Sequence, residues 1–73
     1  MKEYNDVELN KLISEGKEAT IRLGYMKTKK QNNEKKELLI LRRNRWSLIR
    51  KRATELCLTE AELNDIYTYV VLN

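Results

Sequence analysis

Residues 39–56 read LILRRNRWSLIRKRATEL, and the spacing of their apolar residues decides the fold. Five of them are three, four or seven positions apart, which places them along one stripe of an α-helix: Leu39, Trp46, Ile49, Ala53 and Leu56. An earlier stretch repeats the pattern: Leu9, Leu12, Gly16, Ala19, Leu23 and Met26. The polar residues 27–36 between them favour a turn. Together the two stretches predict long helices that pack antiparallel as a hairpin.

The register of this hairpin sets large residues against small ones. Trp46 falls opposite Ala19, and Ile49 falls opposite Gly16. Helices interdigitate closely when bulky and small side chains alternate across their contact. A glycine weakens an isolated helix by about 1 kcal/mol relative to alanine. We explain Gly16 by the close approach of Ile49.

Gly24 has no such explanation, and it leaves an alternative open. The alternation of Ile21, Leu23 and Tyr25 permits a short strand, which would pair with residues 38–41. The sequence therefore leaves residues 18–26 and 38–41 undecided between helix and β-hairpin.

Local signals mark the helix ends. Asn5 or Asp6 can cap the first helix, and Asn33 can cap the second. The run Thr59-Glu60-Ala61-Glu62 is a capping box, which predicts a third helix after a break near Cys57. We expect one all-α domain with helices over about residues 6–27, 34–57 and 59–71. We place Trp46, Tyr67 and Cys57 on its core side.

The amino-acid composition argues against several kinds of site and cellular location. The 73 residues hold one cysteine and no histidine, which excludes an internal disulfide and argues against a structural zinc site. No apolar run is long enough to span a membrane, and the first residues lack the order of a signal peptide. We expect a cytoplasmic protein without metal, cofactor or membrane contact.

Positive charge is concentrated in the middle of the chain. Residues 21–52 hold twelve basic and two acidic groups, whereas the whole chain has a net charge of +4. A basic middle between acidic ends can attract a polyanion, pair with its own flanks, or pair with another copy of the chain.

Six of these cations form what we call the basic ridge. Lys36, Arg43 and Arg50 recur every seven residues, Lys51 lies beside them, and Lys29 and Lys30 extend the row into the turn. Such a row suits phosphate contacts with DNA or RNA. A solvated face and a surface for an acidic host protein are the alternatives. Arg42 differs because it falls within the apolar stripe, where it needs a partner or must reach solvent.

Four apolar residues lie off the predicted core: Ile21, Tyr25, Leu41 and Leu48. The third helix or a second subunit must cover Leu41 and Leu48, and the sequence does not decide between them. Hairpins that are apolar on two sides often pair into four-helix bundles, so we expect a homodimer.

Residues 52–67, RATELCLTEAELNDIY, resemble a helix-turn-helix unit. Cys57 stands where the turn of that motif usually has glycine. The resemblance implies a DNA-reading second helix, but this one carries Glu60, Glu62 and Asp65 and no basic residue, so phosphates would repel it.

Residues 6–19, DVELNKLISEGKEA, resemble the first helix of the all-helical chorismate mutases, and residues 48–71 resemble their second and third helices. The family needs cations around a dicarboxylate, but Gly16 replaces its first-helix arginine. Lys27 is the one match to a catalytic position. The resemblance implies a helical, dimeric fold and argues against mutase activity.

The sequence shows no acid–base pair, activated nucleophile or phosphate loop, so we do not expect an enzyme. We expect a small regulatory protein that binds nucleic acid through the basic ridge. A protein-binding adaptor or inhibitor encoded by a mobile element is the first alternative, and a degenerate or atypical chorismate mutase is the second.

Overall fold

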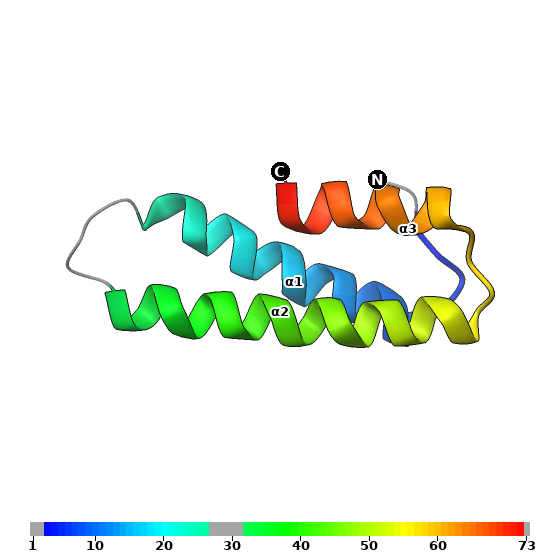
Figure 1. The fold of residues 1–73 in the computed structure, drawn as a ribbon, viewed down its shortest axis with the longest axis horizontal. Helices are drawn as coiled ribbons and strands as arrows, with labels where there is room; N and C mark the ends of the chain where they lie inside the picture. The colour runs from blue at the N-terminus through cyan, green and yellow to red at the C-terminus, as the bar shows by residue number, and fades with distance from the viewer. Residues whose placement is uncertain (1–2, 27–31, 73) are drawn as a thin grey trace.

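The computed structural model describes residues 3–26 and 32–72, which form an all-helical chain. Helix α1 spans Val7–Tyr25 and α2 spans Asn32–Glu55; α3 spans Glu60–Tyr67 and continues into the π-helical turn η2, Thr68–Leu72. The two long helices lie side by side, and α3 with η2 runs back along them to about the middle (Figure 1). The whole measures 42 × 19 × 18 Å. The predicted helical hairpin with a short C-terminal helix is confirmed.

Helix, rather than strand, forms in both segments that the sequence left undecided. Helix α1 continues to Tyr25, and residues 38–41 lie inside α2. No strand occurs within residues 3–26 and 32–72. None of the described atoms comes within 4 Å of a Cβ built on Gly24, so this glycine is not required by packing.

Two of the predicted caps are present. The Asp6 carboxylate accepts a hydrogen bond from the backbone amide of Leu9 (2.8 Å), which satisfies a free donor in the first turn of α1. At α3, the Thr59 hydroxyl accepts from the Glu62 amide (3.2 Å), and the Glu62 carboxylate accepts from the Thr59 amide (3.1 Å). The proposed cap Asn33 is wrong, because α2 already includes Asn32.

Helix α2 ends in a Schellman motif. The amide of Leu58 donates to the carbonyl of Ala53 (3.0 Å) and that of Cys57 donates to Thr54 (3.1 Å). Cys57 is the left-handed residue of this motif, with φ of 58°. Its side chain is exposed, so the expectation that it lies on the core side is wrong.

The core forms where α1 and α2 meet the C-terminal segment, which consists of α3 and η2. Its buried members come from α1, α2, α3 and η2: Leu9, Ile13, Ile49, Ile66 and Val70. Ile66 and Val70 are one helical turn apart, so the C-terminal segment presents a continuous apolar edge to the hairpin.

Gly16 lies under the C-terminal segment. A Cβ built on Gly16 would be 2.8 Å from Val70 Cγ1 but 3.9 Å from Ile49 Cδ1. Ile49 does face Gly16, as the register predicted, yet only at ordinary van der Waals distance. The reason we gave for this glycine is therefore wrong: it is Val70, not Ile49, that needs the space.

One residue of the apolar stripe predicted on α2 differs in the structure: Leu38, and not Leu39, is buried. Leu38 is buried and Leu39 is 42% exposed. Leu38 lies seven residues before Arg45, on the side of α2 that faces α1, whereas Leu39 points along the side that the C-terminal segment covers only in part. Trp46 lies at the edge of the core, where it is partly buried.

Among the described residues, no helix combines the length and the apolar character that crossing a membrane requires.

We predict that Gly16→Ala destabilises the protein. Val70 is fully buried and its branched side chain cannot rotate away, so overpacking of about 1–3 kcal/mol should exceed the gain in helix propensity of about 1 kcal/mol. Gly24→Ala is the matched control and should be stabilising by up to about 1 kcal/mol. Urea unfolding of both variants measures the difference, and equal stabilisation by both would contradict the close approach of Val70.

Cys57→Gly should raise the free energy of unfolding by about 0.5–1 kcal/mol, because glycine adopts the left-handed conformation without steric cost. Cys57→Ala is the control, since it removes the thiol but keeps the Cβ, and should change stability little. If Cys57→Gly lowers the thermal midpoint, the turn does not hold this residue in the left-handed region.

Candidate nucleic-acid interface

The cations of α2 differ in the direction in which they point and in whether an acidic residue pairs with them. On the side that faces α1, Arg45 Nε donates to Glu15 Oε1 at 2.9 Å. At one end of the hairpin, Arg52 forms a similar ion pair with Asp6. These arginines are balanced by acidic groups of the fold itself.

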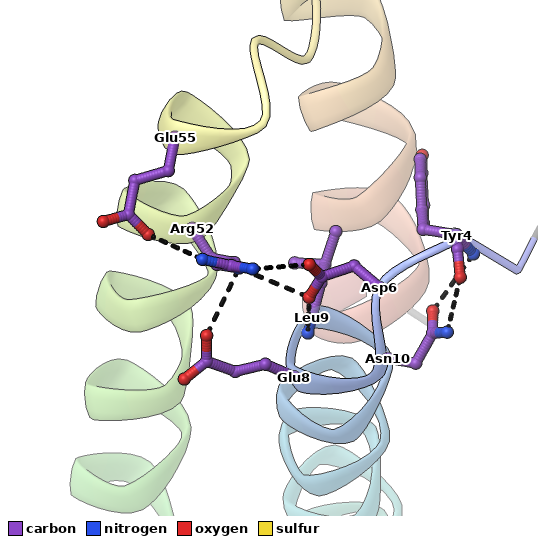
Figure 2. A network of polar contacts seen from close by, with 7 residues as sticks. All are labelled: Tyr4, Asp6, Glu8, Leu9, Asn10, Arg52 and Glu55. Carbon is purple, nitrogen blue, oxygen red and sulfur yellow. Dashed lines mark hydrogen bonds and ion pairs between the residues drawn. The ribbon is translucent and has the colours of Figure 1, made fainter.

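Arg52 is the centre of a polar network that joins the end of α2 to the start of α1 (Figure 2). Its guanidinium lies 2.6 Å from Asp6 Oδ2, 3.2 Å from Glu8 Oε2 and 3.3 Å from Glu55 Oε1. The hydrogen bonds from Arg52 and from the Leu9 amide lower the pKa of Asp6. The hydrogen bonds of Arg52 to the Asp6 and Glu55 carboxylates raise the pKa of Arg52. Asp6 therefore serves both as helix cap and as ion-pair partner.

Lys36, Arg43 and Arg50 of the basic ridge occupy the opposite, outer side of α2, whereas Lys51 lines a hollow that it shares with Arg52. Lys36, Arg43, Arg50 and Lys51 are all exposed. Within the described part of the chain, their side chains form no ion pair or side-chain hydrogen bond. Lys36, Arg43 and Arg50 follow one another at about 10.5 Å, the rise of seven helical residues. Lys29 and Lys30, and Lys27 of the mutase resemblance, lie outside the described residues.

A groove, which we call the aromatic groove, runs beside the basic ridge between α2 and the C-terminal segment, with a cavity volume of about 370 Å³. Trp46 and Tyr67 form its aromatic part, with ring centroids 5.0 Å apart and planes inclined at 69°. Its complete lining is Lys36, Leu39, Ile40, Arg42, Arg43, Trp46, Tyr67 and Val71. The sequence analysis did not predict this groove. The spacing of seven residues from Leu39 to Trp46 places these two on one side of α2, and the spacing of four from Tyr67 to Val71 does the same in the C-terminal segment, but neither spacing shows that the two sides meet.

Arg42 lines the aromatic groove and is partly buried. Its Nη1 donates to the hydroxyl of Thr20 at 3.4 Å. That hydroxyl in turn donates to the carbonyl of Val70. Of the two alternatives for Arg42, a partner or access to solvent, the structure shows a partner, but this partner is a neutral oxygen on α1. The positive charge of Arg42 therefore remains uncompensated among the described residues.

The four apolar residues off the core do not form one surface. Leu41 lines a hollow with Ala19 and Arg45, and Leu48 lines another with Leu12 and Arg52. No residue of α3 or η2 lines either hollow, so the third helix does not cover these two leucines.

The two apolar residues of α1 lie elsewhere. Ile21 lies in a hollow beside Tyr69 of η2, away from both leucines. Tyr25 is 84% exposed at the end of α1.

Two further observations bear on the chemistry of the chain. Across the residues that the structure describes, no three Cys, Asp or Glu side chains gather so that they could hold a metal ion.

No protein-family model matches the chain, and no match was found among curated proteins or solved structures. The inference of function therefore depends on the basic ridge and the aromatic groove.

We predict that Asp6 makes stability dependent on acid pH. Because its pKa in the folded state lies below the ordinary value of 3.8, its contribution is present above that value and is lost as the pH falls through the folded pKa. Asp6→Asn keeps a good helix cap but removes the charge. At neutral pH this variant should have the lower thermal midpoint, and the difference should shrink below about pH 4.

Glu8→Gln is the control for this experiment, because Glu8 is more exposed and touches Arg52 at a longer distance. It should show a smaller effect. If the midpoints of Asp6→Asn and the original protein stay parallel from about pH 5 to pH 2, Asp6 does not form this ion pair in solution.

Proposed function

We propose that this chain is a non-enzymatic regulatory protein that binds nucleic acid through the basic ridge. One observation carries the proposal: the exposed cations Lys36, Arg43, Arg50 and Lys51 have no acidic partner among the described residues, whereas Arg45 and Arg52 of the same helix do. A row of uncompensated cations on a rigid helix attracts a polyanion and releases its condensed counterions.

The geometry of α2 favours an extended partner over a small anion. From Lys36 to Arg50 the basic ridge extends over about 21 Å of helix, and its cations are too far apart to hold one phosphate together. A nucleic-acid backbone presents phosphates along a comparable length. Contacts of this kind position a protein but read little sequence, so we expect weak sequence preference.

Helix α3 is not the element that we propose for this contact. It carries Glu60, Glu62 and Asp65 and no cation in its last turn, so its approach to phosphates would be repulsive. The second helix, rather than the third, is therefore the proposed interface.

The double variant Arg43→Gln, Arg50→Gln should weaken binding to labelled random duplex DNA and to single-stranded RNA, measured by fluorescence anisotropy at low and near-physiological salt. Each lost phosphate contact should reduce the slope of log K against log salt by about 0.9 for duplex DNA, or about 1.8 for the pair.

Lys11→Glu is the matched control, because it changes the net charge by the same two units at an exposed position of α1. It should bind almost as well as the original protein. Equal losses in the double variant and in Lys11→Glu would show that net charge, and not the basic ridge, determines binding.

A protein partner is the second candidate, and it is favoured by Leu48, which is 45% exposed, with the partly buried Leu41. That partner is an acidic host protein or a second copy of the chain. If neither nucleic-acid probe binds even at low salt, this candidate replaces the first. Its characteristic would be association that persists in moderate salt, because burial of apolar surface is insensitive to screening.

A further inference from the structure

The aromatic groove differs from the basic ridge in what it can contact. The basic ridge offers charge alone, whereas the aromatic groove combines two aromatic rings and aliphatic side chains with cations at its edge. Lys36 and Arg43 belong to both, so a chain of phosphates that follows the basic ridge passes directly beside the aromatic groove.

Much of this apolar lining is accessible. Tyr67 is 38%, Leu39 42% and Ile40 50% exposed, and Trp46 is only partly buried. The described C-terminal segment lies beside only part of the hairpin, since η2, Thr68–Leu72, reaches about midway along it (Figure 1). The volume of the aromatic groove, about 370 Å³, lies within the range of roughly 300–1,000 Å³ that is usual for sites that hold small ligands.

Arg42 adds a flat cation to this surface. Its guanidinium is tethered to Thr20, and no described acidic group neutralises it. Nucleic-acid bases stack on aromatic rings and on guanidinium planes. The aromatic groove therefore offers both kinds of stacking partner next to cations that can bind phosphate.

The charges argue against a second copy of the chain as occupant. An isologous dimer brings the same surface of both subunits together, so Lys36, Arg42 and Arg43 would approach their own copies. A duplex is also a poor occupant, because its bases stay paired and stacked. A single strand matches the groove in both respects: its unpaired bases are flat with apolar faces, and its phosphates carry the negative charge that this edge requires.

We propose that the aromatic groove receives unstacked bases of a single-stranded nucleic acid while Lys36 and Arg43 bind the adjoining phosphates. This inference rests on the proposed function and deepens it, since the basic ridge alone would bind single strands and duplexes through the same contacts. Single strands are then the preferred ligand, and bases lie against Trp46 and Tyr67.

Trp46 is the only tryptophan, so its fluorescence reports directly on the aromatic groove. We would titrate the full chain with oligodeoxythymidylate and with a duplex of equal length at the same low salt. The single strand should quench Trp46 and bind more tightly than the duplex. Dextran sulfate, a polyanion without bases, should compete with the single strand for the protein without quenching Trp46.

Tyr67→Leu removes one ring and keeps an apolar side chain. It should weaken binding of the single strand roughly 5- to 150-fold, as expected for the loss of one stacked base, and leave duplex binding unchanged. Tyr25→Leu makes the same change at the end of α1, outside the aromatic groove, and should have no effect. If Tyr67→Leu lowers the thermal midpoint of unfolding, the same binding measurements are made on Ile40→Gln instead. Ile40 lines the aromatic groove and is 50% exposed.

The outcomes separate this inference from the proposed function. Equal affinity for single strand and duplex without quenching of Trp46 would overturn the inference and leave the basic ridge as a phosphate-binding surface. Absence of binding to both would overturn the proposed function as well. Quenching by an acidic peptide but not by oligodeoxythymidylate would assign the aromatic groove to a protein partner and also overturn the inference.

Discussion

The close approach of Val70 to Gly16 is the contact on which the rest of the structure depends. Because Gly16 has no Cβ, the C-terminal segment can lie against α1 and bury Ile66 and Val70. Two side chains of α1 then satisfy carbonyls of η2: Thr20 donates to Val70, and Lys17 donates to Tyr69 at 3.1 Å. The position of η2 in turn decides where the aromatic groove lies.

Charge is used differently on the two sides of α2. On the inner side, ion pairs to Glu15 and Asp6 fix the arginines of α2 and join the helices of the hairpin. On the outer side, the exposed cations stabilise nothing within the described chain, and their mutual repulsion is a small cost to the fold. The hairpin therefore holds a row of cations in a fixed arrangement, which is what a phosphate-binding surface requires.

The errors of sequence reasoning have two physical causes. Leu39 was placed in the stripe instead of Leu38, and Gly16 was attributed to Ile49, because the path of the C-terminal segment was unknown. Cys57 was placed on the core side because helical spacing was extended beyond the end of α2, into a residue with positive φ. The first two errors concern which side of a helix is covered, and that depends on residues far away in the sequence, whereas the error at Cys57 concerns where a helix ends.

The sequence by itself determined the capping box at Thr59, the row of cations on α2 and the helices apart from residues 18–26 and 38–41, because these depend on neighbours within a few positions of one another. Only the tertiary structure decided that Val70 meets Gly16, that Asp6 and Glu15 neutralise Arg52 and Arg45, and that Trp46 and Tyr67 share a groove. These contacts join residues 21 to 54 positions apart. Helical periodicity does not encode such distances, since the angle and register at which helices pack are set by the side chains that meet.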